Sequence, residues 1–172
     1  CRTVWHTDTD KPVAQIAEVV DAGRPLGIDK EWPAKFLIPL METHPGMQVV
    51  LSSDCVDDCR ACKDAEEQTL MREASRINDA VNEAAKHYIK AGMTEREVAE
   101  FIGAQFRAHG CEGPSFTTIV SFGANTADPH HEPDDTVLKE GDCVLFDMGC
   151  VKSRYCSDMT RTWFCGQPTE KQ

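Results

Sequence analysis

Two aspartates near the end of the chain constrain its fold more than any other feature. Asp147 lies in the apolar segment Cys143–Met148, and Asp158 lies just before a second such segment, residues 160–165. Both segments have the length and composition of β-strands, and the chain between them begins at Gly149, a turn-forming residue. If the segments pair as an antiparallel hairpin, the two carboxylates lie side by side on one face of a sheet.

Two carboxylates that lie so close repel each other, and either a divalent cation or a shared proton relieves the repulsion. A metal is the better interpretation, because Asp oxygens suit hard or borderline ions and bridging carboxylates are common in two-metal hydrolytic centres. The residues alone also allow another interpretation, in which each acid ends a strand and accepts hydrogen bonds from backbone groups or from Arg161. Spacing does not choose between the two.

A histidine is expected to join the aspartates. His130 and His131 follow the β-branched segment 117–122 and a loop that begins Gly-Ala-Asn-Thr. Adjacent residues of an extended chain point to opposite faces, so we expect only one of the two to face the aspartates. One His and two Asp on a sheet surface predict metal-assisted hydrolysis. The sequence has no G-x-S-x-G elbow, so no serine nucleophile is predicted.

The ordered motifs of this region resemble the pita-bread metallopeptidases, and among them the Xaa-Pro dipeptidases (prolidases) and aminopeptidase P. The resemblance runs from about residue 56 to the end of the chain. It implies that Asp147 and Asp158 bind two divalent ions, Mn²⁺ or Co²⁺ before Zn²⁺. It also implies that His130, rather than His131, contacts the substrate and polarises the scissile peptide without binding the metal. The segments that carry the resemblance are residues 117–122, 123–133, 138–149 and 155–163.

The sequence departs from the family in one respect. Family members complete the metal site with a His and two Glu from the second half of a pseudo-symmetric domain, and a Glu from that half is the expected general base. After Asp158 this sequence has only Glu170 as a further carboxylate, and no His follows His131. Since it also begins with Cys1, we expect an internal piece of a longer protein, inactive alone.

The expected partners follow from the missing half. The whole protein is expected to act on proline-containing dipeptides or short peptides and to form a homodimer. The piece alone is expected to associate with a second copy or with the complementary half, through an uncovered strand edge and exposed apolar side chains. Those side chains are Val144, Phe146, Trp163 and Phe164.

The chain is predicted to be α+β and to divide into two parts. Residues 1–55 alternate short helix and strand patterns, with stops at Gly23 and Pro45-Gly46, and resemble the end of a creatinase-type N-terminal α/β domain. Residues 56–172 resemble the first half of the pita-bread catalytic domain. They begin with an amphipathic helix over residues 64–91, and Thr94 and Glu97 form a capping box for a helix that reaches Ala108.

Composition excludes several classes of function. A net charge of −11 argues against nucleic-acid binding, and no apolar run is long enough to span a membrane. A cytoplasmic protein with reduced thiols is expected. The spacing of Cys55, Cys59 and Cys62 resembles part of a zinc site, but no fourth ligand lies within a compatible loop.

Two alternatives remain open for the resemblance itself. A creatinase-like C–N hydrolase uses the same scaffold without metal, and a non-catalytic pita-bread binding module occurs in certain histone chaperones. Both typically lose the metal ligands, so the presence of Asp147 and Asp158 weighs against both alternatives. The presence of His130 weighs further against the binding module. Metal analysis of the whole protein separates the first alternative from a peptidase.

Overall fold

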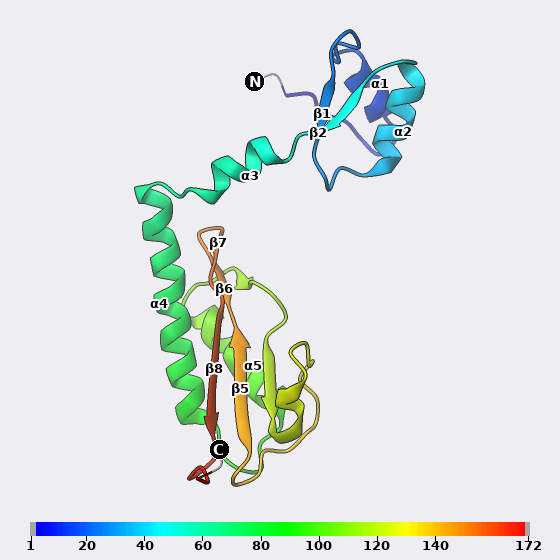
Figure 1. The fold of residues 1–172 in the computed structure, drawn as a ribbon. Coiled ribbons are helices and arrows are strands. Elements are labelled where there is room, and N and C mark those ends of the chain that lie inside the picture. Colours follow the sequence, from blue (N-terminus) through cyan, green and yellow to red (C-terminus); the bar gives the residue numbers. More distant parts are fainter. Residues whose placement is uncertain (1–2, 171–172) are drawn as a thin grey trace. The chain divides into compact units, whose positions relative to one another are not determined.

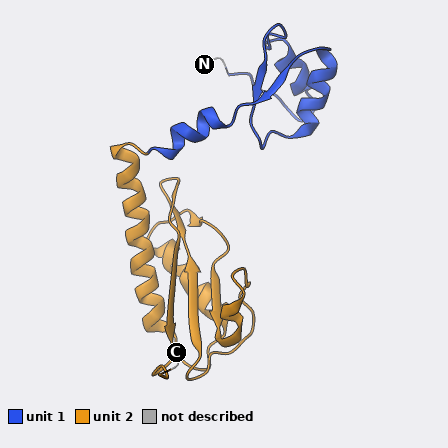
Figure 2. Ribbon diagram, in the orientation of Figure 1, with its two compact units in different colours: residues 1–62 blue, residues 63–172 orange. Residues whose placement is uncertain are grey.

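A computed structural model describes residues 3–170, so Cys1 and the last two residues of the predicted catalytic part lie outside the described residues. The chain forms two compact units, residues 1–62 and residues 63–172 (Figure 2). The boundary between the two units falls after the helix Asp54–Ala61.

The first unit contains a parallel pair of strands linked through a helix. β1 (Leu26–Ile28) pairs with β2 (Val49–Leu51), and α2 (Ala34–Thr43) lies between them in sequence. α1 (Pro12–Ala17) packs against α2 and ends before the predicted stop at Gly23. α3 (Asp54–Ala61), which the sequence analysis did not identify, follows β2.

Two capped helices open the second unit. α4 (Ala65–Tyr88) begins at a capping box formed by Asp64 and Glu67, and α5 (Glu95–Ala108) begins at the predicted box of Thr94 and Glu97. In each box the cap side chain accepts the N–H of the Glu, and the Glu side chain accepts the N–H of the cap residue. These bonds satisfy backbone donors that a helix end otherwise leaves unpaired.

An antiparallel sheet carries the predicted aspartate segments. Its strand order is β4-β5-β8, and α5 lies behind it in Figure 1. Asp147 pairs with Thr160 and Cys143 pairs with Phe164, so the predicted pairing is confirmed. The elements are β3 (Gly113–Pro114), β4 (Ile119–Phe122), the 3₁₀ helix η1 (Gly123–Ala127), β5 (Cys143–Met148), β6 (Cys150–Lys152), β7 (Tyr155–Cys156) and β8 (Met159–Phe164).

The connection between β5 and β8 differs from the prediction of a turn beginning at Gly149. β6 and β7 continue the antiparallel pairing beyond Gly149, and β6 also pairs with β3. The chain reverses at Ser153 and Arg154, whose φ angles are 51° and 67°. Positive φ at both central residues is typical of the type I′ turn, whose twist matches a two-residue hairpin. The prediction of a turn at Gly149 was wrong because glycine occurs in turns and also where two chain segments approach closely.

The core lies between the helices and one face of the sheet. Along β5, Val144, Phe146 and Met148 are fully buried, while Cys143, Leu145 and Asp147 are half-buried. Phe146 packs edge-on against Trp163, with ring centroids 4.9 Å apart. The helices contribute buried apolar residues to the same cluster: Ala74, Val81 and Ala85 from α4, and Val98, Ile102 and Phe106 from α5.

This burial shows that the expectation of exposed Val144 and Phe146 was wrong. Both side chains have 0% exposure, because the helices of the same chain cover their face of the sheet. Trp163 and Phe164 are half-buried. The predicted association therefore cannot rest on an exposed apolar face of β5.

Truncation of Phe146 tests the position of this core. Phe146→Ala is expected to lower the free energy of unfolding by about 3–5 kcal/mol, because it removes a fully buried ring and leaves a cavity. Val137→Ala is the matched control, since Val137 is 41% exposed and should change stability by less than about 0.5 kcal/mol. Urea unfolding of the whole protein measures both, and equal midpoints for the two variants would contradict the assignment.

No helix within residues 3–170 combines the length and apolar character that crossing a membrane requires.

Candidate metal and substrate site

Asp147 lies on the sheet face opposite the helix-packed core. Strand alternation places it between Phe146 and Met148, which are both fully buried, so its own side chain points to the other face. Its Oδ1 atom is nevertheless buried and has no hydrogen-bond partner among the residues that the structure describes. A buried carboxylate oxygen without a partner is unfavourable, and a metal ion is one partner that removes the penalty. The donor atom therefore fits a metal ligand.

The register of β5 is held by a bond from α4. The buried side chain of Asn78 donates from Nδ2 to the carbonyl oxygen of Met148 at 2.9 Å. This bond fixes the residue next to Asp147 against the helix.

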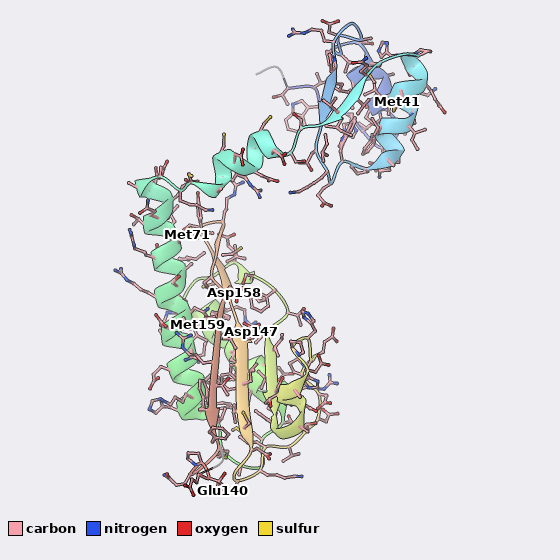
Figure 3. All side chains as sticks on the ribbon, in the orientation of Figure 1. Met41, Met71, Glu140, Asp147, Asp158 and Met159 are labelled. Carbon is pink, nitrogen blue, oxygen red and sulfur yellow. The ribbon has the colours of Figure 1, made fainter. Side chains whose placement is uncertain are left out.

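Asp158 is exposed and directly precedes β8. It lies two residues before Thr160, the pairing partner of Asp147, so both aspartates lie at the same end of the β5–β8 pairing (Figure 3). Ser157 holds the segment in place: its N–H donates to the carbonyl oxygen of Cys150 at 2.9 Å, and its Oγ accepts the Cys150 N–H at 3.0 Å.

The position of Arg161 argues against the interpretation in which Arg161 donates a hydrogen bond to Asp147. It pairs with Phe146 in the register, so its side chain belongs to the helix-packed face. Its Nη2 lies 3.9 Å from Oδ1 of Asp79 on α4.

Gly149 allows the two aspartate segments to approach each other. A Cβ atom at this position would lie 2.0 Å from the carbonyl oxygen of Ser157 and 2.3 Å from Oγ of Ser115. Ser115 Oγ itself donates to the Ser157 carbonyl at 2.8 Å. Only glycine fits between these groups, which explains its place two residues after Asp147.

His130 lies on an exposed loop that follows η1. Its N–H donates to Oδ1 of Asp128 at 2.9 Å, and the Asp128 N–H donates to the carbonyl oxygen of Asn125 at 3.1 Å. η1 contacts both β4 and β5. The structure thus brings Asp147 and Asp158 to one end of the β5–β8 pairing. The loop that carries His130 leaves β4 after Phe122, which pairs with Val144, three residues along β5 from Asp147.

The structure reveals a buried carboxylate that sequence analysis missed. Glu95, the first residue of α5, is fully buried. Its Oε1 accepts the N–H of Phe122 at 2.8 Å and Nδ2 of Asn125 at 3.0 Å. Its Oε2 accepts Nε2 of His131 at 2.6 Å and the N–H of Asp134 at 3.1 Å. In a sequence, a Glu at the start of a helix is common and indicates no special role. The one sequence feature that pointed to this cluster was the adjacent pair His130-His131.

Glu95, His131 and Asp134 have ligand atoms within 4.8 Å of one another. A carboxylate has about four acceptor positions, and four donors already occupy those of Glu95. Hydrogen bonds from Thr136 hold the pKa of Asp134 below its usual value. The cluster is therefore a saturated hydrogen-bond network, and its chemistry does not favour a metal.

The cysteines have varied environments. Cys55, Cys59 and Cys62 are exposed, and Cys150 is buried. Burial, followed by the nearby Cys150 thiol, raises the pKa of Cys111 to about 11. Cys111 packs against the apolar core, which fits the predicted role of a small hydrophobic residue.

Comparison with known proteins places this fold and site in context. The model of metallopeptidase family M24 matches residues 69–172. A Staphylococcus aureus protein named as an uncharacterized peptidase is 39% identical over 116 residues, which cover 67% of this chain and 33% of that protein. The chain therefore spans about a third of the length of that curated relative.

Solved structures match over nearly the whole chain. The prolidase from Pyrococcus furiosus is 32% identical with a TM-score of 0.85, and the match covers 92% of this chain and 47% of that one. The Xaa-Pro dipeptidase from Bacillus anthracis is 29% identical with a TM-score of 0.86, covering 95% and 46%. The predicted α+β class and its relation to the pita-bread fold are thereby confirmed.

Proposed function

Because this chain belongs to metallopeptidase family M24, we propose that the whole protein hydrolyses Xaa-Pro bonds in dipeptides or short peptides. Structural neighbours named as a prolidase and an Xaa-Pro dipeptidase support this choice of bond. The observation that carries the proposal is the buried Oδ1 of Asp147, which has no hydrogen-bond partner among residues 3–170 and lies on the sheet face opposite the helix-packed core.

Asp147 and Asp158 would hold two divalent ions, with Mn²⁺ or Co²⁺ favoured over Zn²⁺. Carboxylate oxygens suit such ions, and the two side chains lie at the same end of the β5–β8 pairing. The remaining ligands would come from other parts of the whole protein. When bound, the ions would supply Lewis-acid polarisation and lower the pKa of water.

His130 would act on the substrate and not on the metal. Its side chain is exposed, while its backbone is fixed by the bond to Asp128, so the ring is free to contact a peptide. A donor directed at the carbonyl oxygen stabilises the negative charge that develops there during hydrolysis. The imidazole of His130 would thus hold and polarise the scissile peptide.

The wider organisation follows from the same family. We propose that residues 1–55 end a creatinase-type N-terminal domain and that residues 56–172 form the first half of the catalytic domain. The strand β8 lies at the edge of its three-stranded sheet among the described residues, and it would pair with the complementary half. A cytoplasmic homodimer is the proposed state of the whole protein.

Substrate choice tests the proposed function. The whole protein, supplied with Mn²⁺ or Co²⁺, is expected to hydrolyse Ala-Pro and to leave Ala-Ala largely intact, whereas residues 1–172 alone should bind the ions weakly and show no turnover. Amine release measured by chromatography gives both rates. Hydrolysis of creatine without metal would favour the creatinase-like alternative, and a protein with neither metal nor turnover would favour the binding module.

A further inference from the structure

We propose that Glu95 is a positioning residue that acts through His130. The proposal rests on the function proposed above, because it assigns a purpose to the loop on which His130 lies. We define residues 123–131 as the His130 loop. Glu95 lies outside this loop, at the start of α5, so its carboxylate connects the loop to a helix whose inner face is part of the core.

The bonds of Glu95 reach both ends of the His130 loop. Phe122, whose N–H it accepts, immediately precedes the loop, and Asp134 follows it. Asn125 and His131 donate from within the loop. One buried carboxylate therefore fixes the entry, the first turn and the exit of the loop, which leaves the loop few ways to move without breaking several bonds to a charged acceptor.

The segment that follows the His130 loop is in turn hydrogen-bonded to the start of α5. The N–H of Glu95 donates to the carbonyl oxygen of Thr136 at 3.2 Å, and the N–H of Arg96 donates to that of Asp134 at 3.2 Å. These are two of the donors that a helix start leaves unpaired. The positive end of the helix dipole also favours the negative charge of Glu95. Loop and helix start therefore stabilise each other.

The adjacent histidines divide two tasks. His131 turns inward and binds Glu95 at 2.6 Å, with its side chain 15% exposed. His130 is the next residue back and is exposed. The imidazole of His131 thus fixes the backbone from which the imidazole of His130 projects, and the position of His130 depends on Glu95.

Glu95→Gln is the main test, made in the whole protein. The substitution keeps the shape of the side chain but replaces one acceptor oxygen with an NH₂ group that faces donors. We expect kcat for Ala-Pro to fall by about tenfold to a hundredfold, as for a displaced positioning group, with the metal content unchanged. Hydrogen exchange should accelerate in residues 123–131. Glu100→Gln, the same change at an exposed position of α5, should alter neither.

A double-mutant cycle with His130→Ala separates positioning from general stability. If Glu95 acts through His130, Glu95→Gln should lower kcat in the native background and have little further effect in the His130→Ala background. An equal loss of kcat in both backgrounds would overturn the inference while leaving the proposed function intact. If His130→Ala does not change kcat, the role proposed for His130 fails, and the inference fails with it.

Two further outcomes are decisive. If Glu95→Gln does not fold, His131→Ala, which removes one of the four bonds, carries the same cycle and the same expectations. If either variant loses bound metal in proportion to its loss of activity, the cluster of Glu95, His131 and Asp134 is a metal site and the inference is wrong.

Discussion

Asp147→Asn in the whole protein is expected to reduce Ala-Pro hydrolysis on the order of a thousandfold, together with most of the bound metal. The amide removes the charge from a side chain whose Oδ1 is buried and has no hydrogen-bond partner within the described part of the chain. Asp158→Asn should behave alike, because it lies at the same end of the strand pairing. Elemental analysis and steady-state kinetics measure the two losses.

Two variants serve as comparisons for this result. Asp135→Asn removes a charge from an exposed ion pair with Arg96 and should leave metal and kcat unchanged. His130→Ala should keep the metal and lower kcat, as expected of a residue that contacts substrate. Metal loss in His130→Ala equal to that in Asp158→Asn would make His130 a ligand. Full metal content in Asp147→Asn would refute the ligand role of Asp147.

Gly149→Ala is expected to destabilise the second unit by about 3 kcal/mol or more, a large effect for the addition of one methyl group. The added Cβ would lie 2.0 Å from the carbonyl oxygen of Ser157, so the two segments must separate. Such a shift moves Asp158, which directly follows Ser157. It should therefore weaken metal binding in the fraction of the variant protein that folds. Urea unfolding and metal titration of the whole protein measure the two effects.

Gly103→Ala is the matched control for this prediction. Gly103 lies within α5, where the nearest side-chain atom to an added Cβ is 3.5 Å away. The same substitution there should stabilise the protein by up to about 1 kcal/mol, because alanine favours a helix interior over glycine. A Gly149→Ala variant as stable as the native protein would show that the close approach at Gly149 is absent.

Local patterns predicted much of the second unit. The length and apolar composition of Cys143–Met148 predicted a strand, and its predicted pairing with the segment around Thr160 is present in the sheet. The capping box of Thr94 and Glu97 predicted the start of α5. These features depend on neighbours in sequence, which is why a sequence alone reveals them.

Features that depend on distant contacts could not be predicted. Glu95 is bound by residues that lie up to 39 positions away, so its role has no local pattern. Gly149 has the same appearance in a turn and in a close approach, and only the position of Ser157 distinguishes the two. The burial of Val144 and Phe146 depended on which face α4 and α5 would cover. The ligand roles of Asp147 and Asp158 and the substrate role of His130 remain predictions.

The bond between Asn78 and the Met148 carbonyl has a consequence for how the chain folds. Asp147 stands between two fully buried side chains, so a shift of β5 by one residue would carry a carboxylate into the apolar core and lift Phe146 and Met148 into water. Asp147 thus also destabilises the shifted alignment of the strand, while the hydrogen bond from the amide of Asn78 stabilises the observed alignment. An apolar residue at position 147 would remove the free-energy penalty on the shifted register, so chains with misaligned strands would be more stable than in the native sequence.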